Sequence, residues 1–359
     1  MIKPTINTLL ICLPLGITAA LLEWNTIWIS TFNFLAILPL CAIVSDASDT
    51  LSESVGELLG GLISATFGNA VELSTGILAI TDGDAYFAQS VMIGSILSDI
   101  LLVFGACLIS ASYSKHIMYF NAAMTDSLSS LMVVTAVALI LPSVLYANFT
   151  SLDLGDEILG FSRGTAAVLL ILYAGYLYFQ LGTHAHLFEQ PKDDNEIKDS
   201  EDKGEAHPDI PTTVAKLLAS IVAIVTCSHL FLASVPATAA ATHISKTFIA
   251  TILIPITSNS TEGAAVIAAS FGGGDVNNAI AIIVGSILQI GLFAIPFLVM
   301  FGWAIGVPVT LYFETFHTLV LFFAILVVNQ VLKDAKYTYL HGSMLIGFYA
   351  ILALAFYVR

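Results

Sequence analysis

Long apolar stretches alternate with short polar connections over the whole chain. About eleven stretches are long enough to cross a hydrocarbon core as helices, which takes about 20 residues each. Their approximate bounds are 5–22, 26–44, 62–81, 88–111, 125–147, 164–183, 212–233, 244–270, 277–301, 309–331 and 341–358. Strands of a membrane barrel would instead alternate polar and apolar positions over about ten residues. The pattern therefore predicts an all-α polytopic membrane protein.

Composition agrees with this interpretation. The chain is 57% hydrophobic and 10% charged, whereas a soluble globular domain has about 25% charged residues. The first stretch lacks a clear small-residue cleavage site and another stretch follows closely, so we interpret it as a helix and not as a signal peptide.

Basic residues predict the orientation. With a cytosolic N-terminus, the larger basic set falls on the cytosolic side and the smaller set on the other, as the positive-inside rule requires. The cytosolic set is Lys3, Lys115, Lys192, Lys198, Lys203, Lys216, Lys333 and Lys336, against Arg163, Lys246 and Arg359. Without the long connection after the sixth stretch the bias is smaller but keeps its sign.

A short polar phrase occurs twice within apolar sequence. Residues 68–73 read GNAVEL and residues 258–263 read SNSTEG, so each copy contains Asn-x-x-Glu. A second phrase follows each copy at nearly the same distance: GSILSDILLVFG from Gly94 and GSILQIGLFAIP from Gly285. This duplication predicts a fold of two related halves with an acidic site between them.

The two copies lie five predicted helices apart. Because five is odd, the second copy enters the membrane from the opposite side, and the halves are inverted. We therefore expect an N-terminal transmembrane helix (1–24), a first five-helix repeat (25–187), an acidic cytosolic linker (188–210) and a second five-helix repeat (211–359).

The formal net charge of −15 is not spread evenly, and the linker holds a dense acidic cluster. Its sequence over 189–206, EQPKDDNEIKDSEDKGEA, shows no apolar periodicity. It is either a solvated loop that keeps the cytosolic face soluble, or a low-affinity collector of cations or a regulatory element near the mouth of the pathway.

The repeated phrases have the chemistry of a cation site. A carboxylate near the bilayer centre needs a partner, a proton or a metal ion, and neither phrase contains Lys or Arg. Ca²⁺ takes about six to eight oxygen ligands, and the absence of Cys and His argues against a soft metal. The candidate ligands are Glu72, Glu262, Asn69, Asn259, Gly68 and Ser258. Protons can neutralise the same carboxylates, and this competition is the thermodynamic basis of cation/proton exchange.

Helix breakers surround both phrases. Gly68 accompanies the first copy, while Pro255 and Gly263 accompany the second. Such residues interrupt a helix and free backbone carbonyls that can bind a cation. For Gly60 and Gly61 we favour close helix packing as the role.

Other candidate chemistry is sparse. The four cysteines all fall in apolar stretches, where buried thiols behave as small hydrophobic groups. Asn148 begins a glycosylation sequon on the predicted non-cytosolic side, close to the membrane, and the sequence leaves its use open. No HExxH motif or nucleophile–base arrangement indicates an enzyme, and no basic patch indicates nucleic-acid binding. A passive channel is the remaining alternative from another class.

With these phrases the chain resembles the cation/proton exchanger family, the vacuolar-type Ca²⁺/H⁺ antiporters of the Ca²⁺/cation antiporter superfamily. The resemblance runs from FLAILPL (34–40) and GELLGGLISATFGNAVEL (56–73) through both GSIL phrases to the C-terminal ILALAFY. It implies that Glu72 and Glu262 bind Ca²⁺ and protons alternately, and that proton motive force drives Ca²⁺ out of the cytosol. It implies no cofactor besides the transported ions, and it favours a vacuolar membrane over a bacterial plasma membrane.

Three positions depart from the family pattern. Ser258 and Gly263 replace the Gly and the His of its second phrase, GNAxEH, and Asp99 stands where the family has Asn. Gln289 resembles the family's Gln. With Asp99, Ser95 and Ser286 it is a candidate for binding a proton or lining the site. The departures keep alternatives open: exchange of Mn²⁺, Na⁺ or K⁺ for H⁺, or of Na⁺ for Ca²⁺.

An acidic series near the connection from the second to the third stretch is the last candidate. Asp46, Asp49, Glu53 and Glu57 lie on the predicted cytosolic side, and the last two share a helix face. They form either a solvated helix end or a vestibule, centred on Glu53 and Glu57, that attracts Ca²⁺ by electrostatic focusing.

Overall fold

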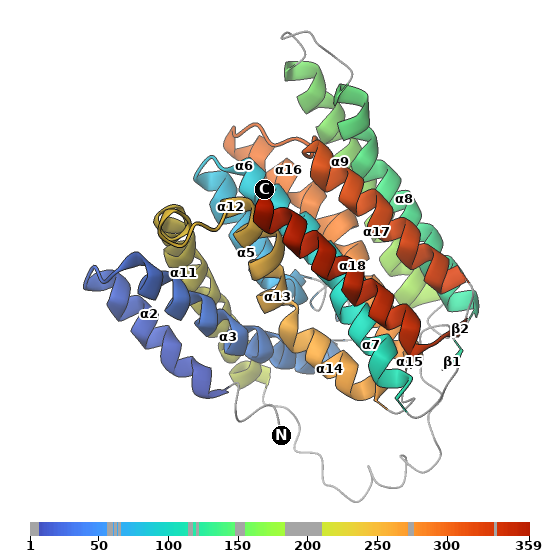
Figure 1. Cartoon of the computed structure of the whole chain (residues 1–359), viewed down its shortest axis with the longest axis horizontal. Coiled ribbons are helices and arrows are strands. Elements are labelled where there is room, and N and C mark those ends of the chain that lie inside the picture. The colour runs from blue at the N-terminus through green and yellow to red at the C-terminus, as the bar shows by residue number, and fades with distance from the viewer. Residues whose placement is uncertain are drawn as a thin grey trace, which may run out of the picture.

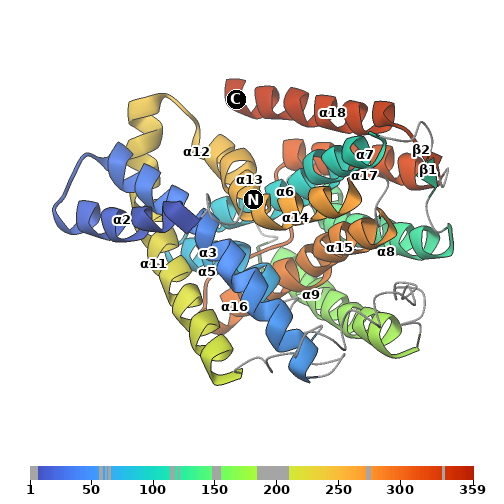
Figure 2. The same cartoon turned by 90° about the horizontal axis from the view of Figure 1, so that it is seen from below.

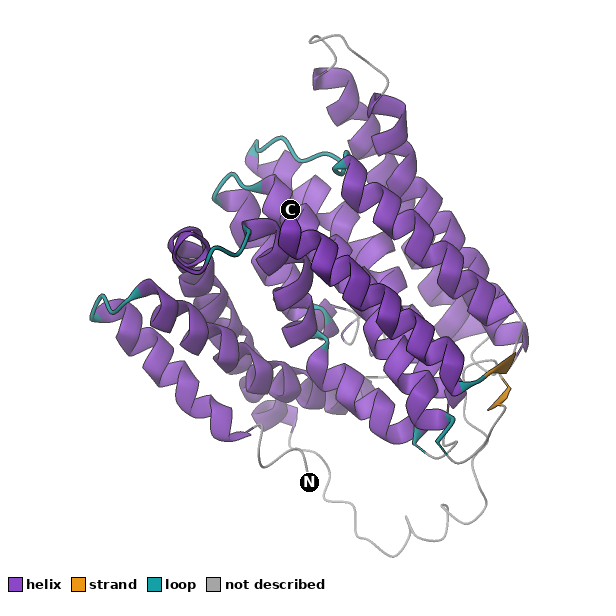
Figure 3. Cartoon of the chain, in the orientation of Figure 1, coloured by secondary structure: helices purple, strands orange, loops and turns teal. Residues whose placement is uncertain are grey.

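The computed structural model describes residues 7–55, 60, 63, 66–113, 118–119, 122–147, 155–183, 210–271, 276–333 and 336–359. Nearly all of this chain is helical (Figure 3). The predicted linker 188–210, apart from its last residue, and Asn148 of the sequon lie outside the described residues.

The first half of the chain contains seven described α-helices. They are α2 (Cys12–Leu21), α3 (Thr26–Val55), α5 (Ala70–Thr81), α6 (Ala85–Leu97), α7 (Phe104–Ala111), α8 (Ala122–Ala147) and α9 (Gly155–Tyr178). A 3-10 turn (Leu9–Ile11) precedes α2. One π-helical turn (Ser98–Val103) joins α6 to α7, and another (Phe179–Thr183) extends α9.

The second half has a similar succession. Its α-helices are α11 (Ile210–Thr242), α12 (Lys246–Phe248), α13 (Ile254–Ser258), α14 (Ser260–Ser270), α15 (Val276–Gln289), α16 (Ile295–Ile305), α17 (Thr315–Lys333) and α18 (Tyr339–Val358). One π-helical turn (Ile249–Leu253) joins α12 to α13, and another (Ile290–Ala294) joins α15 to α16. In both halves, therefore, a π-helical turn follows the GSIL phrase.

The described strands are short and pair with each other. β1 (Met118–Tyr119) and β2 (Lys336–Tyr337) are antiparallel, with Met118 opposite Tyr337. The sequence pattern gave no sign of them, because two residues are too few to show alternation. Their pairing connects the segment just before α8 to the connection between α17 and α18.

Eight described helices are long and apolar enough to cross a membrane, and three shorter apolar helices accompany them, at Leu9–Leu21, Ala70–Thr81 and Lys246–Ser258. The predicted class of helical integral membrane protein is thereby confirmed, while the count of eleven spans stays a prediction. The second predicted stretch, 26–44, is longer than expected, since α3 continues to Val55. The polar sequence after Ser45 contains no Gly or Pro until Gly56 and so does not end the helix.

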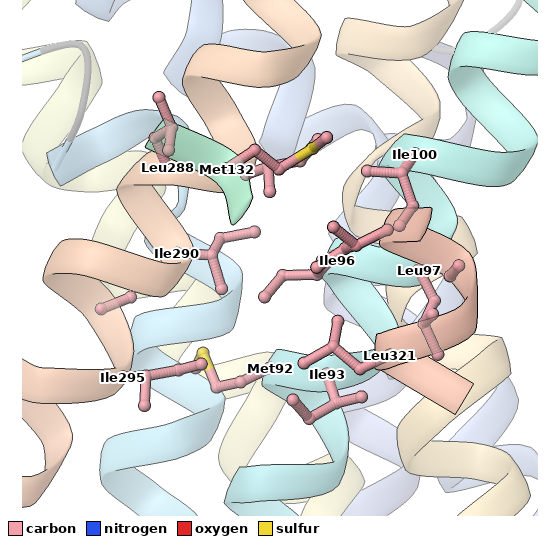
Figure 4. Close-up of a cluster of buried hydrophobic side chains, with 14 of the residues drawn as sticks. Met92, Ile93, Ile96, Leu97, Ile100, Met132, Leu288, Ile290, Ile295 and Leu321 are labelled. Atoms are coloured by element: carbon pink, nitrogen blue, oxygen red, sulfur yellow. The ribbon is translucent and has the colours of Figure 1, made fainter. Parts of the chain in front are cut away.

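Two hydrophobic clusters divide the described structure. The smaller cluster joins α2, α3 and α11 and includes Cys12, Val44 and Ile224, one from each helix, with Val71 of α5 beside them. These three helices form a group on one side of the molecule (Figures 1 and 2). The larger cluster fills the rest. Its centre lies between α6 and the α15–α16 segment, where Met92, Ile96, Leu288, Ile290 and their neighbours gather (Figure 4). Buried apolar side chains packed in this way fix the helices around the site.

Candidate cation site

Both Asn-x-x-Glu phrases lie at helix interruptions. Asn69 precedes α5, and Asn259 separates α13 from α14. The carbonyl of each Asn accepts the first helical hydrogen bond of the following helix, from Leu73 N at 2.9 Å and from Gly263 N at 2.8 Å. The two copies therefore have the same local construction, with the Asn at the break and the Glu one turn later.

The position of each Glu in its helix suits a negative charge. Glu72 and Glu262 lie in the first turns of α5 and α14, where unpaired backbone N–H groups and the helix dipole stabilise an anion. Glu72 is deeply buried, with 2% of its surface exposed, whereas Glu262 is partly exposed.

A cavity of about 450 Å³ brings the two acidic side chains together. It lies at the boundary between the two hydrophobic clusters, with Val44 and Ile224 of one and Leu177 and Val266 of the other in its walls. The predicted residues that line it are Gly68, Glu72, Ser258, Glu262, Ser286 and Gln289. Carboxylate, amide, hydroxyl and carbonyl oxygens from both halves thus border one space.

Ser95 connects the two halves beside this cavity. Its hydroxyl lies 2.9 Å from Glu72 Oε1 and 3.2 Å from Asn259 Oδ1, while Asn259 Nδ2 donates to the Ser95 carbonyl at 3.2 Å. The Ser258 hydroxyl also reaches Asn259 Oδ1, at 3.3 Å. Both polar atoms of the Asn259 amide are therefore engaged, and its role in this arrangement is to hold the helix break against α6.

The remaining candidates form two further pairs. Asn69 Nδ2 donates to Gln289 Oε1 at 2.9 Å, and the Ser286 hydroxyl donates to Asp99 Oδ2 at 2.8 Å. Asp99 is the second residue of the π-helical turn after α6 and is 5% exposed. It does not border the cavity itself but reaches it through Ser286, a cavity-lining residue. π-Helical turns occur frequently at functional sites.

The glycines of the first phrase region have different surroundings. A Cβ on Gly68 would meet no atom within 4 Å, so this position opens into the cavity. A Cβ on Gly60 would overlap the Ser52 carbonyl, as close helix packing requires. In the second phrase, a Cβ on Gly263 would lie 3.0 Å from Val103 Cγ2, so Val103 occupies part of the space that a larger side chain would need.

The two GSIL phrases differ in how closely they are packed. A Cβ on Gly94 would overlap the backbone carbonyl of Thr251, so α6 and the 249–253 turn are in direct backbone contact. A Cβ on Gly285 would find its nearest neighbour, the Tyr176 hydroxyl, at 3.8 Å. The first interface is closed, whereas Gly285 borders the cavity.

The sequence interpretation missed part of the lining. Thr261, between Asn259 and Glu262, borders the cavity, as do Cys41, Ser45 and Ser48 of α3. Asp49, a member of the predicted acidic series, borders it as well. The signal was a helical series of small or polar residues, Cys41, Ser45, Ser48 and Asp49, at spacings of three and four. The acidic vestibule proposed around Glu53 and Glu57 lies outside the described side chains.

Two acidic side chains alone do not complete a coordination sphere. Across the ranges that the structure covers, no group of three or more His, Cys, Asp and Glu side chains could hold a metal ion. A cation in this cavity would take its other ligands from amides, hydroxyls, carbonyls and water, which suits a hard cation that must also leave.

Comparison with known proteins identifies the family. Residues 25–182 and 212–358 match the family described as sodium/calcium exchanger protein. The vacuolar calcium ion transporter of Schizosaccharomyces pombe is 34% identical over 352 residues, which cover 98% of this chain and 84% of that protein. The Ca²⁺/H⁺ antiporter of Aphanothece halophytica is 30% identical over 97% of this chain and 95% of its own length.

The fold has counterparts among solved structures. The structure of native YfkE matches 99% of this chain and 100% of its own, with a TM-score of 0.83 at 23% identity. The structure of the H⁺/Ca²⁺ exchanger CAX matches 99% of this chain with a TM-score of 0.70. The family match and the relatives of 30% identity or more confirm the resemblance found in the sequence: the chain belongs to the sodium/calcium exchanger protein family, a family of transporters.

Proposed function

We propose that this chain is a Ca²⁺/H⁺ antiporter that moves Ca²⁺ from the cytosol into an acidic compartment. The observation that carries the proposal is the single cavity bordered by Glu72 and Glu262, each one turn after a helix break. The names of two relatives, a vacuolar calcium ion transporter and a Ca²⁺/H⁺ antiporter, support the choice of ions.

The mechanism follows from competition for the same oxygens. Ca²⁺ enters the cavity and is held by the two carboxylates together with neighbouring neutral oxygens, among which Gly68, Ser258 and the Asn69–Gln289 pair are the candidates. Protons on the acidic side neutralise the carboxylates and weaken the attraction for the divalent ion. The protonated, metal-free site then returns to the cytosolic side, and the cycle exchanges Ca²⁺ for protons.

Two inverted five-helix repeats, residues 25–187 and 211–359, would provide alternating access, with 1–24 as an additional helix and 188–210 as the linker. The paired helix breaks, the π-helical turn after each GSIL phrase and the two matched segments 25–182 and 212–358 support this division. The cavity-lining residues Asp49 and Gln180 lie near the ends of α3 and α9 that the predicted orientation assigns to the cytosol, which supports an inward-open arrangement.

The membrane is the remaining assignment. The relatives from Schizosaccharomyces pombe and Arabidopsis thaliana are named as vacuolar proteins, which supports a vacuolar membrane. The cyanobacterial relatives from Aphanothece and Synechocystis support a bacterial plasma membrane as the alternative.

Exchange of another cation, Mn²⁺, Na⁺ or K⁺, is the second candidate function. Two observations favour it: Gly263 lacks the family's imidazole and its space is bordered by Val103, and Asp99 adds a buried carboxyl group next to Ser286. An additional acid beside the cavity suits a further proton or a monovalent ion.

Uptake of radioactive Ca²⁺ into proteoliposomes with an acidic interior tests the proposal. Uptake should require the pH gradient, collapse when a protonophore is added, and disappear in the Glu72→Gln variant. Uptake that persists without a gradient would indicate a channel. Gradient-dependent uptake of Mn²⁺, Na⁺ or K⁺ without uptake of Ca²⁺ would establish the second candidate function instead.

A further inference from the structure

A polar cluster lies at the end of the molecule opposite the cavity opening. Glu314, just before α17, accepts a 2.5 Å hydrogen bond from the Tyr86 hydroxyl of α6 and forms an ion pair with Arg359 after α18. His317 Nδ1 lies 3.3 Å from Glu314 Oε2. In Figure 1 the C-terminus lies near α6 and α12, at this same end.

His317 reaches from this cluster toward the closed interface. Its ring is 2% exposed, and Nε2 lies 3.1 Å from the Thr251 hydroxyl. Thr251 belongs to the π-helical turn Ile249–Leu253, and its carbonyl is the atom that a Cβ on Gly94 would overlap. The imidazole thus connects the Glu314 carboxylate to Thr251, the residue in backbone contact with Gly94.

The partners of the ring assign its hydrogen atoms. Nδ1 lies 3.3 Å from a carboxylate oxygen, so we assign the hydrogen of the neutral ring to Nδ1, and Nε2 then accepts from the Thr251 hydroxyl. The groups around the ring are Glu314 just before α17, Tyr86 on α6, Thr251 on the turn and Phe356 on α18, with Arg359 paired to Glu314. Among these groups the charges of Glu314 and Arg359 already balance.

A proton on His317 would disturb this balance. It would place a second positive charge beside a carboxylate that Arg359 already neutralises, inside an apolar wall that includes Phe356. It would also turn Nε2 into a donor, so the hydrogen bond to Thr251 would persist only with its direction reversed, the hydroxyl then accepting. Burying an unbalanced charge is costly, and water relieves that cost when the interface opens.

We propose that His317 is a positioning residue that acts as a proton-sensitive latch: the neutral ring holds Thr251 against Gly94, and its protonation favours opening of this side. The latch deepens the proposed function, because the predicted orientation places this end in the acidic compartment. Acid there would promote the opening through which Ca²⁺ leaves and protons enter. The latch controls access and takes no part in binding Ca²⁺.

A thiol placed in the closed interface reports opening without requiring transport. Ser90, one turn before Gly94 on the same face of α6, is 1% exposed. A Ser90→Cys variant would be made after the four buried native cysteines are replaced by alanine. The rate of labelling by a water-soluble thiol reagent would be measured in lipid nanodiscs between about pH 7 and about pH 5.5, a range in which histidine titrates.

His317→Gln is the matched control, because its amide can donate to Glu314 and accept from Thr251 without titrating. At each pH, the labelling rate with His317 present is divided by the rate in the His317→Gln variant, and this ratio cancels the pH dependence of the thiol itself. We expect acidification to raise this ratio about tenfold, equivalent to about 1.4 kcal/mol. A ratio that does not change with pH would overturn the latch.

Thr251→Val provides a second check, since it removes the hydroxyl but keeps the branched shape. It should raise labelling at neutral pH and weaken the response to acid, and an unchanged response would contradict the proposal. Ca²⁺ uptake measured in parallel separates the two hypotheses. If the labelling ratio does not depend on pH while Ca²⁺/H⁺ exchange is normal, only the latch hypothesis is refuted. If the ratio depends on pH as expected but no Ca²⁺/H⁺ exchange occurs, only the proposed function is refuted.

Discussion

Asn69 donates a 2.9 Å hydrogen bond to Gln289, which lies 220 positions later in the chain. Asn259 makes the complementary connection, because its amide bonds both the hydroxyl and the carbonyl of Ser95. The Asn of each helix break is thus tied to the GSIL phrase of the other half. Any movement of one half relative to the other must stretch or exchange these bonds, which couples them to the geometry of the cavity.

The two glutamates are the first test. Glu72→Gln and Glu262→Gln keep the side-chain shape but remove the negative charge, so each should reduce Ca²⁺/H⁺ exchange to the background of empty liposomes. Both variants should still insert and purify as folded protein, because a neutral amide costs less than a carboxylate in an apolar surrounding. Robust exchange by either correctly inserted variant would sink the proposed mechanism.

The bond between Asn69 and Gln289 can be measured by a double-mutant cycle. We expect Gln289→Ala to lower the apparent affinity for Ca²⁺ about tenfold. The substitution removes an amide oxygen that lines the cavity, and it also leaves the Asn69 amide without its acceptor in Gln289. Combined with Asn69→Ala, the two changes should be non-additive by about 1 kcal/mol. Strictly additive effects on affinity would show that the pair does not act as one unit.

The two GSIL phrases offer a matched pair of alanine substitutions. Gly94→Ala forces a methyl group into the Thr251 carbonyl, so it should destabilise the closed interface by about 1–3 kcal/mol and slow exchange. Gly285→Ala meets its nearest atom at 3.8 Å and should change stability by less than about 1 kcal/mol. Thermal unfolding and initial rates of Ca²⁺ uptake would be measured for both variants. Equal effects would contradict the conclusion that Gly94 is closely packed while Gly285 borders an open cavity.

The missing histidine of the second phrase can be restored. Gly263→His alone should reduce folded yield and transport, because its Cβ would lie 3.0 Å from Val103 and the ring extends further. Val103→Ala in the same chain makes room, so the double variant should recover transport and show a changed pH dependence of uptake. If the single variant were fully active, Val103 would not limit this space.

The helix breaks were predictable because they depend on local chemistry. Gly68 directly precedes the break at Asn69, and Pro255 and Gly263 lie in the short helices on either side of the break at Asn259. Glycine and proline weaken a helix, so both regions could be marked from the sequence. Asp49 was harder to place, since its distance from the phrases depends on how far α3 continues past the apolar stretch. For acidic residues beyond the membrane core, the sequence does not show whether the side chain faces the cavity or the solvent.

The closed interface could not be read from the sequence. Both GSIL phrases begin with the same residues, yet only Gly94 meets an opposing backbone. The different packing of Gly94 and Gly285 belongs to one conformation of the protein. If the two halves exchange roles during transport, the same sequence must also suit a second conformation, in which the packing of the two phrases is reversed. The π-helical turns were equally hidden, because uniformly apolar stretches carry no periodicity that distinguishes them from α-helix.

These π-helical turns also set the rotational phase of their helices. A π turn accommodates about one residue more than an α turn, and one residue corresponds to about 100° around a helix axis. Ser286 and Gln289, before the turn at Ile290–Ala294, border the cavity. Phe297 and Met300, about three α-helical turns later, would share their face in a continuous α-helix but pack against the larger hydrophobic cluster. A continuous α-helix of the same sequence would keep one phase throughout. The extra residue lets a single span serve the ion pathway along one part of its length and the hydrophobic wall along the other.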